Sequence, residues 1–92
     1  MKTLHLNLKQ KWFEQIKSGE KTEEYRIRNN YWNKRLEKDY DQVVIKLGYP
    51  AKTDTSRVMI FECKGIVEKC VTHEEFGYGV HVYAIQLGER IQ

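Results

Sequence analysis

The feature that most constrains the fold is the separation of helical from strand-like patterns along the chain. Amphipathic helical spacing is confined to residues 1–38, whereas the sequence from residue 42 onward alternates or forms short apolar runs typical of strands. Parallel strands need a crossover connection, usually a helix, and the second half of the sequence offers none. The sequence therefore predicts a β-rich α+β fold built on a small, mostly antiparallel sheet.

Local patterns place the individual elements. Strands are marked by alternating or continuous apolar residues, and the two helices by apolar residues three or four positions apart. Lys64 and Gly65 interrupt a stretch too long for one flat strand, so we expect a bulge or bend there. The expected elements are a strand over 4–8, a helix over 10–18 ending at Gly19, a strand over 21–27, a helix over 31–38 capped by Asn29 or Asn30, strands over 42–47, 57–70 and 80–87, and a loop over 72–79.

Length and composition are those of one small globular domain spanning residues 1–92. The net charge of +3 is compatible with a polyanionic partner but does not establish one. Two cysteines without a CxxC spacing suit a reducing compartment. The N-terminus alternates and so is unlike a signal peptide, and no apolar run approaches the ~20 residues of a membrane span. We expect a cytoplasmic protein without membrane attachment, and the sequence leaves its oligomeric state open.

The stretch 18–26 has no simple packing explanation. It combines a turn glycine, a lysine, glutamates, a tyrosine and an arginine, and its predicted strand is polar on both faces. A strand in a small barrel normally turns apolar residues inward on one parity. This strand therefore either runs along an edge or lines a pocket with polar side chains.

Four positions in this stretch carry a resemblance to a known family. Gly19, Lys21, Glu24 and Arg26 fit the pattern G-x-K-x-x-E-x-R, and the pattern follows a helix that ends in residues 16–19, Ile-Lys-Ser-Gly. In both respects the chain resembles the ASCH domain, a branch of the PUA-like superfamily of small β-barrels. The similarity extends over the whole chain in length and in the order of its elements. It implies a PUA-like pseudo-barrel with two short helices.

The resemblance also implies a cleft between the first helix and the motif strand that binds RNA or a modified nucleoside. Lys21 and Arg26 suit contacts to phosphate or base oxygens, Glu24 can accept from an exocyclic amine, and aromatic residues can stack on a base. The alternative is that Glu24 and Arg26 form a structural ion pair that closes the cleft without a ligand. The expected ligand-binding residues are Gly19, Lys21, Thr22, Glu24, Tyr25, Arg26, Arg28, Tyr31 and Trp32.

A hydrolase of the same fold is the second functional hypothesis. Some ASCH proteins resemble amidohydrolases that deacetylate acetylated cytidine with a lysine, a threonine and a carboxylate, and others are ribonucleases. Lys21 matches that lysine, but Glu24 occupies the position of the threonine, and Thr22 could replace it only if the backbone bends. A catalytic lysine needs a destabilised ammonium, whereas the neighbouring glutamates stabilise it. If the protein is an enzyme, Lys21 and Glu24 are the expected catalytic residues.

The run over residues 26–38 holds five cations and one acid, so it is a candidate path for a phosphate backbone. Within it, Trp32 could stack on a base, although packing on the core is the favoured interpretation. A protein-interaction domain that uses Tyr31 and Trp32 is a third functional hypothesis.

The histidines offer little support for a metal site. His5 and His81 lie on the first and last strands, which often pair in a closed barrel, and His73 lacks the second histidine of an H-E-x-x-H motif. We expect neither a metal nor another cofactor. The loop over 76–79, Phe-Gly-Tyr-Gly, is flexible enough to cover a cleft, although ordinary turns often have this composition.

Overall fold

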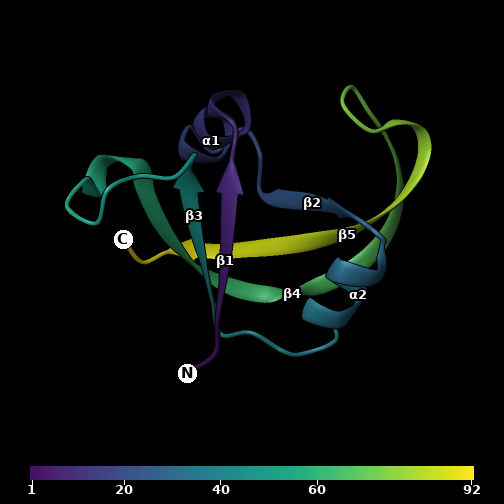
Figure 1. The fold of residues 1–92 in the computed structure, drawn as a ribbon, viewed down its shortest axis with the longest axis horizontal. Coiled ribbons are helices and arrows are strands. Elements are labelled where there is room, and N and C mark those ends of the chain that lie inside the picture. The colour runs from purple at the N-terminus through teal and green to yellow at the C-terminus, as the bar shows by residue number, and fades with distance from the viewer.

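One five-stranded mixed sheet and two short helices make up the computed structural model, which describes residues 1–92 (Figure 1). The β-rich α+β class expected from the sequence is therefore confirmed. The elements in chain order are β1 (Thr3–Leu8), α1 (Gln10–Lys17), β2 (Glu23–Ile27), α2 (Asn30–Arg35), β3 (Gln42–Leu47), a 3-10 turn (Thr55–Arg57), β4 (Val58–His73) and β5 (Gly77–Arg90).

The strands lie in the order β1-β3-β4-β5-β2. β1 and β3 are parallel, which is possible because the chain between them contains both helices, and the other three pairings are antiparallel. The expected pairing of the first and last strands is wrong, because β5 pairs with β4 and β2. His5 and His81 consequently do not oppose each other in the sheet. β1 and β2 are its two edges, so no backbone ladder closes the sheet into a barrel.

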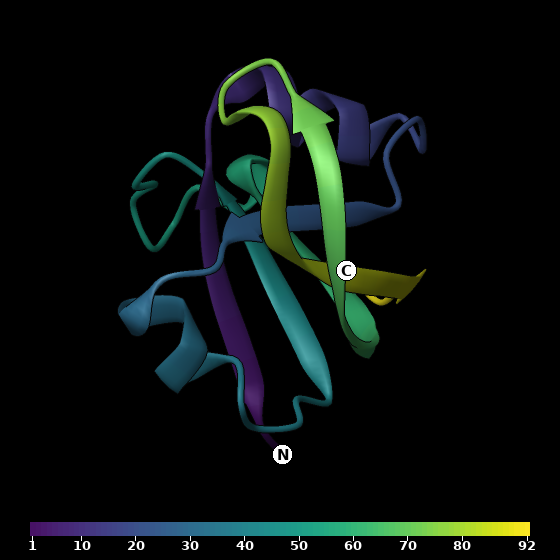
Figure 2. The same cartoon turned by 90° about the vertical axis from the view of Figure 1, so that its right-hand side faces the viewer.

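A side chain, and not a strand pairing, connects the two edges of the sheet. Figures 1 and 2 show the sheet curling, with β1 and β3 crossing over β4 and β5. The guanidinium of Arg26 on β2 donates from Nη2 to the backbone carbonyl of Asn7 on β1, at 3.1 Å. This contact lies beside the cleft described below and helps to fix the distance between its walls.

The core lies between the curled sheet and α1. Phe13 and Ile16 of α1 are buried, as the amphipathic spacing of this helix predicts. They pack with the alternating leucines of β1, with apolar residues of β3, β4 and β5, and with Leu36, which follows α2. Trp12 and Trp32 are partly buried and pack on the outside of this cluster. The buried cluster is Leu4, Leu6, Leu8, Phe13, Ile16, Leu36, Val43, Ile45, Met59, Phe61, Ile85 and Leu87.

α2 begins as predicted and ends earlier than expected. The side chain of Asn29 accepts a hydrogen bond from the backbone N–H of Trp32 at 2.9 Å, so Asn29 is the N-cap. The helix stops at Arg35, whereas the sequence pattern extended to residue 38. Tyr40 donates its hydroxyl to the carbonyl of Arg35, at 2.6 Å, and so satisfies one of the carbonyls freed at the helix end.

β4 and β5 form a long hairpin that corrects another expectation. The predicted loop over 72–79 is mostly strand, because His73 pairs with Gly77 and only the residues between them form the turn. The expected bulge is confirmed, since the β4–β5 register shifts between Phe61 and Gly65. Gly65 has a φ of 132°, a conformation that side-chain-bearing residues rarely adopt.

Candidate functional site

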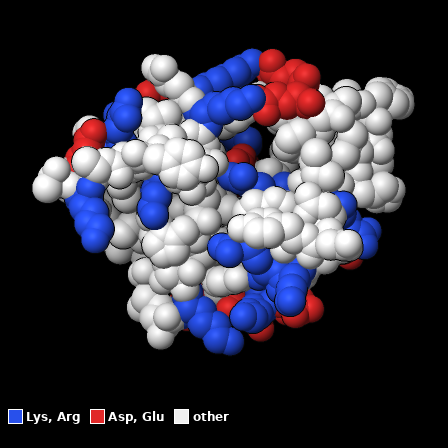
Figure 3. Space-filling view, in the orientation of Figure 1, with Lys and Arg blue, Asp and Glu red and all other residues white.

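A cleft of about 250 Å³ opens between α1, β2, α2 and the tip of the β4–β5 hairpin. Figure 3 shows the surface hollowed on this face, with acidic atoms in the hollow and cationic atoms around it. The lining residues come from five separate segments of the chain, so the cleft exists only in the folded domain. They are Asn7, Leu8, Lys9, Trp12, Lys21, Glu24, Tyr25, Arg26, Ile27, Asn29, Trp32, His73, Glu75 and Phe76.

Glu24 is the only charged residue in the buried set, with 5% of its surface exposed. Its Oε1 lies 2.7 Å from Nζ of Lys21, and its Oε2 lies 3.1 Å from Nη2 of Arg26. The two cations offset the cost of burying the carboxylate. We call Lys21, Glu24 and Arg26 the charged triad; it places an acceptor between two donors on the lining of the cleft.

Local structure explains why these three residues converge. Glu24 and Arg26 are two positions apart on β2 and so lie on the same face of the sheet. Lys21 belongs to the turn after α1, where Gly19 has a φ of 84° and Lys21 donates its backbone N–H to the carbonyl of Gln15 at 3.0 Å. The conformation of Gly19 turns the chain back along the helix end, which carries Lys21 to the strand.

Aromatic rings form the walls of the cleft. Nζ of Lys21 lies 4.7 Å from the ring centroid of Trp12 and 5.3 Å from that of Tyr25. On the other side, the guanidinium carbon of Arg26 lies 5.1 Å from the centroid of Trp32. Both cations are therefore held against aromatic faces. Trp32 thus packs on the core, as the favoured interpretation of the sequence has it, and it also lines the cleft.

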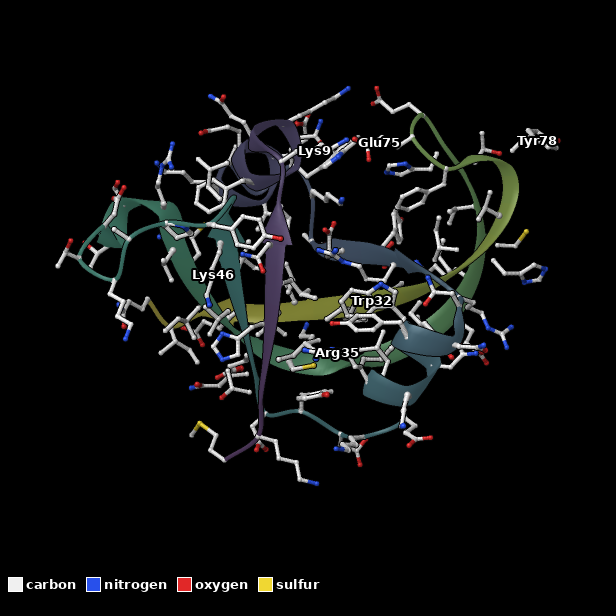
Figure 4. The ribbon with its side chains drawn as sticks, viewed as in Figure 1. Lys9, Trp32, Arg35, Lys46, Glu75 and Tyr78 are labelled. Carbon is white, nitrogen blue, oxygen red and sulfur yellow. The ribbon has the colours of Figure 1, made fainter.

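Ionic contacts join the hairpin tip to α1 at the mouth of the cleft. Lys9 contacts Glu75 at 3.1 Å, and the indole N–H of Trp12 donates to the same carboxylate at 3.0 Å. Figure 4 shows Lys9 and Glu75 facing each other across the top of the molecule. Hydrogen bonds from Trp12 and Lys9 lower the pKa of Glu75. These exposed contacts, together with the Lys11–Glu74 pair, form what we call the clasp.

Stacked rings lie beneath the clasp. The imidazole of His73 stacks on the ring of Phe76, with centroids 4.3 Å apart, and lies 4.8 Å from the ring of Trp12. The His73 ring also meets Tyr25 edge-on at 5.9 Å. The hairpin tip is therefore held to the cleft by aromatic packing as well as by charge.

Tyr25, which lines the cleft, is held in place by Glu23 on the same parity of β2. The hydroxyl of Tyr25 donates to Oε1 of Glu23 at 2.7 Å, and Glu23 also contacts Lys69 and Gln86. Burial and this hydrogen bond raise the pKa of Tyr25 to about 12. Partial burial alone would raise the pKa of Glu23, but hydrogen bonds from Lys69, Tyr25 and Gln86 lower it overall.

The structure brings together five of the nine ligand-binding residues expected from the sequence, and four lie outside the cleft. Gly19 shapes the turn before β2, and Thr22 is exposed, with its carbonyl accepting from the N–H of Leu87 at 3.0 Å. Arg28 pairs with Glu68 at 3.1 Å, and Tyr31 is 60% exposed. The residues that do line the cleft are Lys21, Glu24, Tyr25, Arg26 and Trp32.

The largest omission from the sequence-based site is the wall formed by Trp12, His73, Glu75 and Phe76. Trp12 belongs to α1, and the other three belong to the hairpin tip. The combination of aromatic and glycine residues after His73 was the one available signal, and it indicated that the segment could cover a cleft. It did not identify which cleft.

No group of three His, Cys, Asp or Glu side chains in the chain is arranged to hold a metal ion. None of its helices has the length and apolar character needed to cross a membrane. Comparison of the chain with protein-family models, with curated proteins and with solved structures gives no match. The function is therefore argued from the cleft.

Proposed function

We propose that this chain is an ASCH-type domain of the PUA-like superfamily, and that it binds RNA or a modified nucleoside in the cleft. The observation that carries the proposal is a carboxylate, 5% exposed, held between Lys21 and Arg26 on the lining of an aromatic-walled cleft. Single-stranded bases are recognised by this combination, because aromatic faces stack on the base while polar groups bond to its edge.

The dimensions of the cleft favour one base or nucleoside. Its volume of about 250 Å³ is just below the roughly 300–1,000 Å³ of common small-molecule sites. Cations at its rim suit the phosphates that flank a bound nucleotide. Arg35, whose guanidinium lies near the ring of Tyr31, extends the positive charge beyond the cleft, whereas the charge of Arg28 is offset by its ion pair with Glu68. We therefore propose that one base inserts into the cleft and that the flanking phosphates bind to cations outside it.

Binding can be tested through the tryptophans that line the cleft. Single-stranded RNA oligonucleotides and free nucleosides are titrated while the fluorescence of Trp12 and Trp32 is recorded. Lys21→Met should weaken binding at least about tenfold, because it removes a charge-assisted contact. Lys17→Met is the matched control, since Lys17 is exposed at the end of α1 and lies outside the cleft. Equal affinities of wild type and Lys21→Met would contradict the proposal.

A hydrolase is the second candidate, and the observation that favours it is a lysine and a carboxylate, Lys21 and Glu24, that lie 2.7 Å apart on the lining of the cleft. The threonine hydroxyl that could complete the set is missing from the cleft, since Thr22 is exposed and does not line it, and the hydroxyl of Tyr25 donates to Glu23. Incubation with acetylated cytidine and with RNA, followed by chromatography of the products, tests this candidate. Turnover that Lys21→Met abolishes would support it, and an absence of turnover would contradict it.

A further inference from the structure

We infer that the cleft selects the imide edge of uracil-type bases, an inference that rests on the proposed binding function. The charged triad presents a donor, an acceptor and a donor in that order, as Lys21, Glu24 and Arg26. The Watson–Crick edge of uracil presents the complementary order, namely the O4 acceptor, the N3–H donor and the O2 acceptor. Each group of the triad then has one counterpart on the base.

The triad retains hydrogen-bonding capacity for this edge. An ammonium has three N–H groups, and Lys21 directs one of them to Glu24. Arg26 uses Nη2 for Glu24 and for the carbonyl of Asn7, and its Nη1 makes no hydrogen bond within the protein and is not buried, whereas its Nε is buried and out of reach of a ligand. A carboxylate offers about four acceptor positions, of which Lys21 and Arg26 occupy two. Donors for two oxygens and an acceptor for one N–H therefore remain.

Each of the other bases would place at least one donor against a donor of the triad, or one acceptor against its acceptor. Cytosine and adenine present a ring nitrogen lone pair at the central position, where it would face the Glu24 carboxylate. Guanine presents a central N–H, but its exocyclic amine would then face a cation of the triad. A buried carboxylate whose free acceptor positions receive no hydrogen bond from the base costs more than an exposed one, which water can still reach, so the central position discriminates most strongly. Burial of Glu24 to 5% exposure provides that condition.

Wild-type protein and a series of nucleosides test this inference without any mutation. Uridine, 3-methyluridine, 5-methyluridine and cytidine are titrated by calorimetry. Methylation at N3 removes the central donor, whereas methylation at C5 leaves the whole edge intact, so 5-methyluridine is the matched control. We expect uridine and 5-methyluridine to bind about 10- to 100-fold more tightly than 3-methyluridine and cytidine.

A second arm separates free nucleosides from polymers that carry the same edge. Oligouridylate is compared with oligocytidylate of equal length at one salt concentration, because phosphate contacts contribute equally to both. A preference for oligouridylate without measurable uridine binding would show that the uracil edge is recognised only within an RNA strand. A preference in both arms would show that the base alone suffices.

The Glu24→Gln variant connects the preference to the triad. Its amide places a donor beside the position of N3–H, so the ratio of uridine to cytidine affinity should fall toward one. If this variant does not fold, the wild-type nucleoside series still decides the question. Equal affinities for uridine, 3-methyluridine and cytidine would overturn the inference and leave the proposed function standing. Failure of every nucleoside and RNA to bind would overturn the proposed function and the inference with it.

Discussion

Replacement of Arg26 by methionine should lower the free energy of unfolding by about 2 kcal/mol. Arg26 makes a hydrogen bond to the Glu24 carboxylate and one to the Asn7 carbonyl, both at 3.1 Å. A bond between charged groups contributes about 1.5–3 kcal/mol and one to a neutral group about 1 kcal/mol. Removal of the buried, unpartnered Nε returns about 1 kcal/mol of desolvation cost. Methionine keeps most of the side-chain packing on Trp32, so contact loss adds little.

Urea titration followed by tryptophan fluorescence measures this change. In a domain of this size, about 2 kcal/mol corresponds to a decrease of about 8–16 °C in the melting temperature. Arg28→Met is the matched control, because its ion pair with Glu68 is exposed and should contribute less than about 1 kcal/mol. Equal and small effects of both substitutions would refute the reasoning, since they would show that the Arg26 contacts behave as solvated surface contacts.

Four further predictions concern the core, the bulge and two titrating groups. Phe13→Ala should cost about 3–5 kcal/mol in urea denaturation, because Phe13 is 1% exposed, and a loss below about 1 kcal/mol would contradict its place in the core. Gly65→Ala should cost about 1–3 kcal/mol from backbone strain at φ 132°, since its added Cβ would meet no atom within 4 Å; unchanged stability would contradict this cause. The pKa of Tyr25, raised to about 12, predicts that absorbance at 295 nm will show one tyrosine ionising later than the others, and that this late step will be absent from Tyr25→Phe. The stability that Tyr25 contributes should be lost as the pH rises from 10 toward 12. Because the pKa of Glu75 is lowered in the folded protein, its contribution to stability should be present above pH 4.5 and lost below it. The melting temperature of Glu75→Gln should therefore fall less on acidification than that of wild type. An equal fall would contradict the clasp contact.

Much of the fold could be predicted because its determinants are local. Alternation of leucines located β1, the Trp12–Ile16 spacing located α1, and the glycine at position 65 located the bulge. Strand partners depend on contacts distant in sequence, so the parallel β1–β3 pair was not anticipated. The end of α2 coincides with a hydrogen bond from the Tyr40 hydroxyl to the Arg35 carbonyl, a contact that no helical periodicity reveals.

The candidate site likewise has one part that local sequence patterns predict and another that depends on contacts distant in sequence. Lys21, Glu24 and Arg26 are close in sequence, and strand alternation with one turn suffices to bring them together. The opposite wall requires the hairpin tip, where Glu75 reaches a lysine 66 positions away. One sequence pattern could therefore identify half of the cleft, and the other half needed the tertiary structure.

The pairing of β2 with β5 has a consequence for how the domain acquires its cleft. β4 and β5 are joined by a short turn, so their pairing closes a small loop and should form early. β2 lies in the first third of the chain, yet its strand partner is the last strand. During synthesis, the segment that carries Glu24 must therefore wait until residues 82–86 have been made before it can pair. We expect the cleft to be among the last parts of the molecule to form.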